Sequence, residues 1–174
     1  SRTMIYIPVL MSALVVGITI NWMFSQEYGL INFIIQSFGG TPLEWSLNSG
    51  LATFVIGFAS VWASIGFNMI IYVGGINNIS PDLYEAASID GANSFQSFLR
   101  ITVPMLSPTT FLVVLLSTVN LLKEYALVQG ITQGGPGLST TYIIQYIFDK
   151  GFNQMEYGYA SAISTVVMIV FALI

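Results

Sequence analysis

Four long apolar runs, separated by polar segments, dominate the sequence. They cover about residues 4–24, 50–73, 105–128 and 157–174. Each approaches the roughly 20 apolar residues that a helix needs to cross a bilayer. The segments between them are rich in glycine, proline, asparagine and acidic residues, which are typical of loops and short helices. The pattern predicts an all-α protein, a polytopic membrane helix bundle of four spans that forms one transmembrane domain over 1–174.

Two of the polar segments contain short apolar stretches. Residues 29–38 are too short to cross a membrane and too apolar for a free loop, so we expect a helix that lies in the membrane interface. Residues 140–152 predict another short helix outside the bilayer core, after the turn Gly-Gly-Pro-Gly at 134–137.

The loop over residues 75–103 carries its own helix signals. The tripeptide Ser-Pro-Asp at 80–82 supplies an N-cap, a proline at the first helical position and an acidic group near the positive end of the helix dipole. Gly91 stands where a residue tolerant of left-handed angles ends such a helix. Asn93, with Gln96 three residues later, favours the start of a second helix. We therefore expect two short helices that meet at Gly91, outside the bilayer core.

The third apolar run contains a pair of charged residues. Only 14 residues, from Thr109 to Leu122, separate Pro108 from Lys123 and Glu124, which is about 21 Å of helix against a hydrocarbon core of roughly 30 Å. Because the apolar run resumes after the pair, these charges could lie at membrane depth, where they would be functional candidates. Alternatively, the helix ends there and both side chains reach the interface. The sequence leaves both interpretations open.

Other polar residues of the runs are also candidates for a substrate path. Asn68, in a run rich in small residues, either forms an interhelical hydrogen bond or lines a path, and Ser161 has the same two alternatives. Tyr125 directly follows the charged pair, and this position makes it a candidate. The residues that we assign to the path are Asn68, Asn120, Lys123, Glu124, Tyr125 and Ser161.

Composition narrows the function. Hydrophobic residues make up 55% of the chain and charged residues 7%, whereas about a quarter of a soluble domain is charged, so we expect the protein in a bilayer. With neither Cys nor His, disulfides, thiolate nucleophiles, imidazole bases and nearly all transition-metal sites are excluded. There is no phosphate-binding loop, no nucleophile and base pair, and no basic patch for nucleic acid. A transport subunit, a membrane scaffold and, behind these, a membrane enzyme remain.

The two ends of the chain indicate a fragment, and its positive charges do not orient it in the membrane. The chain opens with Ser-Arg-Thr and stops inside an apolar run, so we expect a fragment that lacks N-terminal helices and the C-terminal end. Alternating the loops puts Arg2 and Arg100 on one side and Lys123 and Lys150 on the other, a tie that cannot orient the protein by its positive charges.

The loop sequence carries a resemblance. Glu-Ala-Ala at 85–87, Asp-Gly-Ala at 90–92, and then Ile101, Pro104 and Pro108 are similar, without a departure, to the EAA loop of permease subunits of binding-protein-dependent ABC importers. The segments 133–137, 142–152 and 158–163 resemble the carbohydrate branch of that family, the maltose and glycerol-phosphate permease type.

This resemblance implies partners and an orientation. The loop would be cytoplasmic, and its two coupling helices would dock on an ATP-hydrolysing subunit that itself binds ATP and magnesium, so this chain would hold no cofactor. Segments 25–49 and 123–156 would face an extracytoplasmic solute-binding protein. A second permease subunit and two ATP-binding subunits would complete a sugar importer in the cytoplasmic membrane of a bacterium or archaeon. The coupling residues would be Glu85, Ala86, Ala87, Asp90, Gly91, Ala92 and Pro104.

Three alternatives to a sugar importer stay open. A membrane scaffold or receptor could use a docking loop without transport, and an ABC importer could carry a solute other than a sugar. A secondary transporter fits the composition, but it has no need of the loop pattern.

Overall fold

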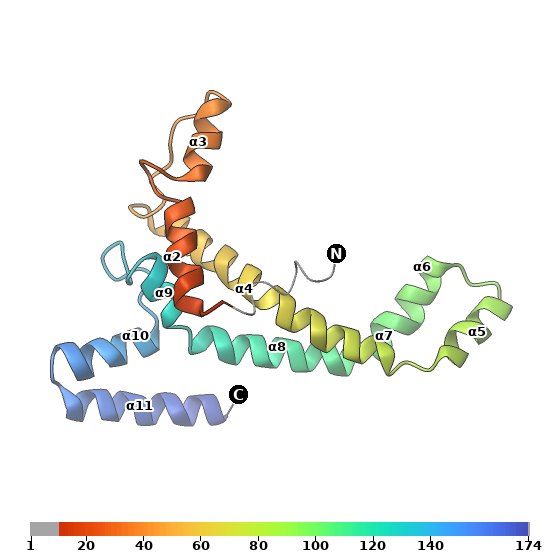
Figure 1. Cartoon of the computed structure of the whole chain (residues 1–174). Coiled ribbons are helices and arrows are strands. Elements are labelled where there is room, and N and C mark those ends of the chain that lie inside the picture. Colours follow the sequence, from red (N-terminus) through yellow and green to blue (C-terminus); the bar gives the residue numbers. More distant parts are fainter. Residues whose placement is uncertain (1–10, 174) are drawn as a thin grey trace.

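The computed structural model describes residues 11–173, and this part of the chain is helical without strands. It is elongated, with a bundle at one end and a hairpin of short helices at the other (Figure 1). The elements are α2 (Ala13–Met23), α3 (Leu30–Ser37), α4 (Ser49–Asn77), α5 (Pro81–Ile89), α6 (Ser94–Ser97), the π-helix η1 (Phe98–Thr102), α7 (Val103–Met105), α8 (Ser107–Leu122), α9 (Ala126–Ile131), α10 (Ile143–Phe148), the π-helix η2 (Asp149–Asn153) and α11 (Tyr157–Ala172).

Helix α4 is the longest element. Its 29 residues extend about 43 Å, with a mean hydropathy of 1.9 in a window that is only 22% buried. Most of this apolar surface is thus exposed, as expected for contact with lipid rather than water. Among residues 11–173, α4 alone is long and apolar enough to cross a membrane, or two spans exist if α6–α7 and α8 count as one bent span. The four spans therefore stay a prediction.

Helix α4 extends beyond Val73, near which the sequence places the end of the second run. Helix α4 continues through both glycines to Asn77. A Cβ on Gly75 would lie 2.5 Å from Thr109 Oγ1 and 3.0 Å from Leu106 Cδ2. This glycine therefore serves the close approach of α4 to α8, and it does not end the helix.

The third run is not one continuous helix, which corrects the span over 105–128. Helix α8 ends at Leu122, and α9 begins at Ala126. At its other end, the stretch Ser94–Met105 meets α8 at a bend of 59°. Pro104 and Pro108 lack the N–H group that a straight helix needs, and just before them the Val103 N–H bonds to the Phe98 carbonyl in the wide turn of η1.

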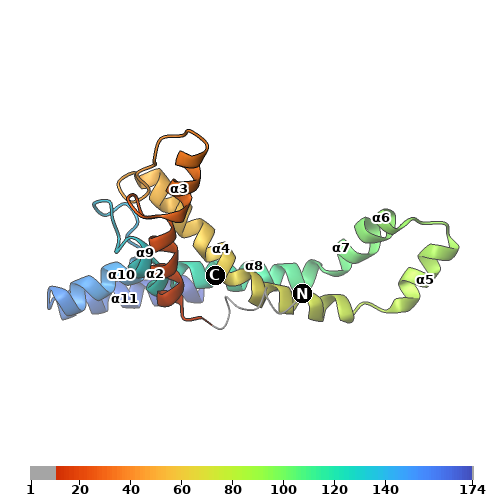
Figure 2. The ribbon, with the colours of Figure 1, turned by 45° about the horizontal axis from the view of Figure 1, so that its top comes forward.

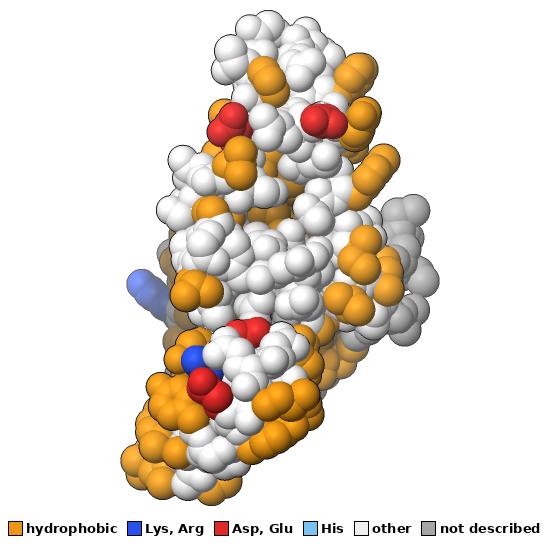
Figure 3. Space-filling model, turned by 90° about the vertical axis from the view of Figure 1, so that its left-hand side faces the viewer, with side chains coloured by type: hydrophobic (Ala, Val, Ile, Leu, Met, Phe, Trp, Pro, Cys, Tyr) orange, Lys and Arg blue, Asp and Glu red, His pale blue; other side chains and the backbone are white. Residues whose placement is uncertain are grey.

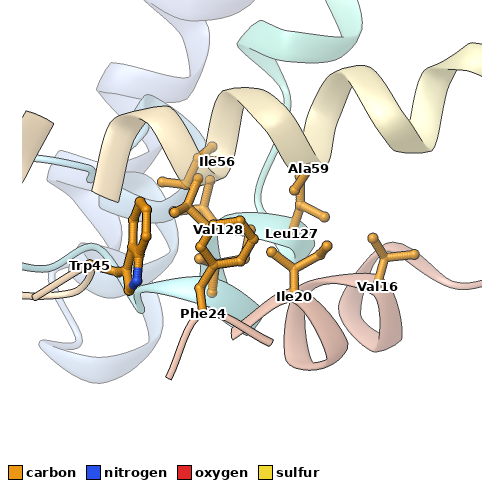
Figure 4. Close-up of a cluster of buried hydrophobic side chains, with 10 residues drawn as sticks. Val16, Ile20, Phe24, Trp45, Ile56, Ala59, Leu127 and Val128 are labelled. Atoms are coloured by element: carbon orange, nitrogen blue, oxygen red, sulfur yellow. The ribbon is translucent and has the colours of Figure 1, made fainter. Parts of the chain in front are cut away.

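Helices α2, α4 and α9 form the core. Val16 and Ile20 of α2 face Leu127 and Val128 of α9, with Ile56 of α4 beside them (Figure 4). Close approach of α2 and α9 depends on two glycines, Gly17 and Gly130: a Cβ on Gly17 would lie 3.0 Å from Gly130 Cα. The bundle is therefore held by a small apolar cluster and a backbone contact. The buried cluster comprises Val16, Ile20, Phe24, Trp45, Val55, Ile56, Ala59, Leu127, Val128 and Ile131.

Residues 24–48, between α2 and α4, form a segment that we call the outer hairpin. Its helix α3 confirms the short helix expected over 29–38. Asn32, 1% exposed, holds this hairpin together. Its Nδ2 donates to the carbonyls of Gln26 (3.1 Å) and Leu43 (3.0 Å), and its Oδ1 accepts from the Leu43 N–H (3.0 Å) and from Trp45 Nε1 (2.9 Å). Every hydrogen-bonding position of the amide is used.

Replacing Asn32 by leucine is expected to open the outer hairpin. The change leaves the buried Trp45 indole N–H without a partner, which costs about 1–3 kcal/mol, whereas water can replace the amide at the backbone groups of the exposed Leu43. Limited proteolysis between residues 38 and 44 should accelerate at least roughly tenfold, which corresponds to about 1.4 kcal/mol. Gln36→Leu, an exposed amide on the same helix, is the control. Equal cleavage rates in the two variants would show that the hydrogen bonds of Asn32 do not hold the outer hairpin together.

Candidate functional site

The hairpin of α5 and α6 has the caps that the sequence predicts. Ser80 Oγ accepts from the Asp82 N–H at 3.4 Å, and Pro81 is the first helical residue. Gly91 has φ of +78°, which a glycine adopts without strain. Asn93 and Gln96 form the reciprocal capping box, with bonds of 2.9 and 3.0 Å. The prediction of two short helices that meet at Gly91 is confirmed.

This hairpin exposes small side chains and carboxylates together with large apolar side chains, such as Ile89 and Phe95. Glu85 and Asp90 are exposed, and α5 has no buried residue. The hairpin extends away from the rest of the chain in two views of the molecule (Figure 2). Ala86 and Gly91 are exposed as well, whereas Ala87 and Ala92 are half-buried. Pro104 lies apart from this surface, in α7 at the base of the hairpin. Such a surface can insert into a cleft of another protein.

A hydrogen bond across the hairpin was missed in the sequence. The Tyr84 hydroxyl lies 2.8 Å from Thr102 Oγ1 and joins α5 to η1 over 18 residues. Thr102 is 8% exposed, so this bond is shielded from water. It ties the outgoing leg of the hairpin to the returning leg and favours movement of the hairpin as one body. No spacing rule reveals this pair, because its contact depends on the angle at which α5 returns toward η1.

A cavity of about 890 Å³ lies along α4 and α8 and reaches the break before α9. It brings together four of the residues assigned to the substrate path, namely Asn68, Asn120, Lys123 and Glu124. Four hydroxyl side chains add further polar groups, and apolar residues of α2, α4, α8 and α9 complete the wall; the hydroxyls are those of Ser60, Ser64, Tyr72 and Ser117. Amide, hydroxyl and charged groups in an apolar cavity suit a small ligand rich in hydroxyl groups.

The remaining two path residues lie elsewhere. Tyr125 lines a neighbouring cavity instead, and Ser161 is exposed on α11 and lines neither. No cluster of three or more potential metal ligands exists within residues 11–173.

Lys123 and Glu124 occupy the break between α8 and α9. Lys123 is exposed at the C-cap of α8. Glu124 is half-buried, and its Oε1 accepts from the Leu127 N–H at 3.1 Å, so this carboxylate caps the start of α9. This capping role adds to the two interpretations that the sequence left open. The carboxylate is positioned by the chain itself while it also lines the cavity.

The whole chain can be compared with known protein families. Residues 1–174 match the family described as "Binding-protein-dependent transport system inner membrane component". The chain belongs to this family. The resemblance drawn from the EAA loop is thereby confirmed, and the match supports a transport role rather than a catalytic one.

Similar proteins include permease proteins of several sugar transport systems. The chain is 36% identical to MalF of the trehalose/maltose system of Thermococcus litoralis, over 94% of this chain and 55% of that protein. It is 33% identical to AraP of the arabinooligosaccharide system of Bacillus subtilis, over 97% and 55%. It is 34% identical to LacF of the lactose system of Rhizobium radiobacter, over 99% and 59%. The chain thus spans less than two thirds of the length of these relatives.

Solved structures give the same fold. A bacterial ABC transporter that imports the acidic polysaccharide alginate superposes with a TM-score of 0.89 at 24% identity, over 99% of this chain and 61% of that one. The alginate transporter in complex with an alginate pentasaccharide-bound periplasmic protein gives a TM-score of 0.85 at 25% identity, with the same coverage. The predicted all-α permease fold is confirmed.

Proposed function

We propose that this chain is a membrane-spanning subunit of an ATP-driven sugar importer, in the cytoplasmic membrane of a bacterium or archaeon. It would cross the membrane several times and form the translocation path together with a second permease subunit. Two ATP-binding subunits would bind ATP and magnesium and hydrolyse the nucleotide, and an extracytoplasmic solute-binding protein would deliver the sugar. Family membership and the names of the sugar-system relatives support this proposal.

The observation that carries the proposal is the projecting hairpin of α5 and α6. It exposes Glu85 and Ala86, and the bond between Tyr84 and Thr102 makes it resist bending. When nucleotide closes a pair of ATPase subunits, a docked rigid hairpin transmits the displacement to α4 and α8, which enter and leave it. The cavity lies along these same two helices. A sugar that binds the cavity differently in the two states is therefore coupled to nucleotide.

Reconstitution of the complete transporter in liposomes tests this function. We expect uptake of a labelled neutral oligosaccharide only with ATP and magnesium inside and the solute-binding protein outside. Co-purification with an ATPase but without uptake would favour the scaffold. Uptake driven by an ion gradient in the absence of ATP would favour a secondary transporter. Either result would overturn the proposal, and uptake of a solute other than a sugar would overturn its choice of substrate.

Removing one polar group of the cavity should slow transport. For Asn120→Ala we expect an uptake rate about tenfold lower at saturating loaded binding protein, since one hydrogen bond to the sugar contributes about 1.4 kcal/mol. Basal ATP hydrolysis should not change. Ser161→Ala, which lies outside both cavities, should transport at the normal rate. Equal rates in the two variants would remove Asn120 from the path.

A pair of Glu124 variants separates its charge from its capping role. Glu124→Gln keeps an oxygen that can accept from the Leu127 N–H, whereas Glu124→Ala loses it. If the charge contacts sugar, both variants slow uptake, but only Glu124→Ala also lowers the melting temperature, by the loss of a cap of about 1 kcal/mol. Normal uptake by Glu124→Gln would leave Glu124 a capping residue only.

A further inference from the structure

A second cavity, of about 520 Å³, lies between α9, the loop over residues 132–141 and the α10–η2 segment. Five amide side chains line it: Gln129, Gln133, Gln145, Asn153 and Gln154. An amide can donate and accept at once, as a sugar hydroxyl can. Figure 3 shows the side of the molecule on which these segments lie, where basic and acidic side chains are close together and hydrophobic side chains surround them.

Gln145 carries an unsatisfied buried group. It is 7% exposed, and its Nε2 donates to Gln129 Oε1 at 3.1 Å. Its Oε1 has no hydrogen-bond partner among the residues that the structure describes. Gly134 leaves room for this amide, because a Cβ there would lie 3.1 Å from Gln145 Nε2. A buried carbonyl oxygen without a partner is costly, and a ligand hydroxyl would remove this cost once the fully buried Oε1 turns toward the cavity.

Aromatic rings supply the apolar side of the same cavity. Tyr125 and Phe148 have ring centroids 5.2 Å apart, and Phe148 stacks on Phe152 at 4.9 Å. Tyr146 also lines the cavity. The electron-rich faces of such rings attract the C–H groups of a sugar ring. Amides and rings together suit a ligand that has one polar edge and one apolar face.

The charged groups near this cavity form one ion pair and leave one carboxylate that only amides contact. Asp149 accepts from Asn153 Nδ2 and Gln154 Nε2, both at 2.8 Å. Lys150 donates to Gln154 Oε1 at 2.7 Å and pairs with Glu156 at 3.3 Å. The hydrogen bond to Glu156 raises the pKa of Lys150, so this ammonium group stays charged at neutral pH. Among the described residues Asp149 has only neutral amides as partners, so its carboxylate at the cavity disfavours an anionic ligand and a neutral ligand fits better.

Two neighbouring residues at the break between α8 and α9 line the two cavities, one each. Glu124 lines the larger cavity, and its neighbour Tyr125 lines the smaller one. We propose that the smaller cavity is an outer subsite that binds one ring of a neutral saccharide before the sugar reaches the larger cavity. This inference rests on the proposed function, which would place residues 123–156 on the side where sugar arrives.

Direct binding to the complete transporter, in nanodiscs and without the solute-binding protein, tests the subsite. The probes are maltotriose, lactose, raffinose and arabinotriose, each measured by saturation-transfer NMR. We expect contacts from at least one probe, weakened about tenfold in Gln145→Leu and in Gln129→Leu. Gln145→Leu loses the hydrogen bond from Gln145 Nε2 to Gln129 Oε1, so its melting temperature is measured beside its sugar contacts, and Gln129→Leu, which loses the same bond from the other side, provides a second variant. Asn21→Leu, exposed on α2 and outside both cavities, is the control.

Each other result overturns the subsite. No contact from any probe, or equal contact in all three variants, would show that the cavity does not bind sugar. Unchanged sugar contact with weakened affinity for the solute-binding protein would show that it receives a protein segment instead. The proposed function is scored separately, by ATP-dependent uptake in the unsubstituted transporter. Normal uptake with normal sugar contact in Gln145→Leu and Gln129→Leu would retain the importer and remove the outer subsite.

Discussion

Glu85→Lys is expected to reduce solute-stimulated ATP hydrolysis of the complete transporter by roughly 100-fold. Glu85 is exposed on α5, and no hydrogen bond or ion pair of its carboxylate exists within residues 11–173. Reversing the charge of Glu85 should therefore weaken docking on the proposed ATPase subunit and leave the fold of this chain unchanged. Loss of a charged contact at a protein interface costs about 2–5 kcal/mol, and about 2.7 kcal/mol corresponds to 100-fold.

Gly91→Pro should have the same effect by another route. The φ of +78° at Gly91 is closed to proline, which is fixed near −65°. The hairpin must then change the angle between α5 and α6, so that Glu85 no longer meets its partner. In both variants we expect the subunits to assemble fully or weakly, while solute no longer stimulates hydrolysis.

The controls separate coupling from general damage. Glu27→Lys makes the same change of charge within residues 25–49, which in the proposed function face the solute-binding protein, so a higher concentration of that protein should restore stimulated hydrolysis in Glu27→Lys but not in Glu85→Lys. Gly91→Ala should lie between the extremes, because alanine adopts the left-handed region at a cost of about 1–2 kcal/mol. Uptake at the unsubstituted rate in both Glu85→Lys and Gly91→Pro would remove the coupling role of the hairpin.

Within the hairpin of α5 and α6, the sequence predicts the helix caps but not the long-range hydrogen bond. The caps at Ser80, Gly91 and Asn93 join groups a few residues apart, so the residue types alone determine them. The bond between Tyr84 and Thr102 joins groups 18 residues apart. It exists only after η1 turns back beside α5, which the sequence does not show.

The same distinction explains the substrate path. Polarity at membrane depth selected Asn68, Asn120, Lys123 and Glu124, and all four line one cavity. The hydropathy pattern placed residues 123–125 inside the third run, but the helix breaks there. The reason is that the apolar residues of α9 pack in the core and do not extend α8. Polarity also selected Ser161, which lies on α11 away from the cavity. Residue type indicates candidates, whereas helix packing decides which of them meet.

Gly17→Leu is expected to separate α2 from α9 and to give the largest loss of stability among the substitutions considered. A Cβ at this position would lie 2.8 Å from the Leu127 carbonyl oxygen and 3.0 Å from Gly130 Cα. These are backbone atoms, which cannot move aside as a flexible side chain can. The two helices must therefore separate, which opens contacts of Val16 and Val128 in the core. Overpacking of this kind costs about 1–3 kcal/mol, and the opened core adds to it.

Thermal unfolding of the detergent-purified complete transporter measures this effect. A loss of about 3 kcal/mol should lower the melting temperature by about 6–12 °C and reduce the monodisperse fraction. Gly130→Leu should do the same, because a Cβ there would lie 2.9 Å from Gly17 Cα. Gly158→Leu is the matched control, since nothing lies within 4 Å of a Cβ at that glycine. If Gly17→Leu and Gly158→Leu have the same melting temperature, α2 and α9 do not depend on their backbone contact. If it melts far below, the cavity and the break at Glu124 depend on two glycines that no polar pattern marks.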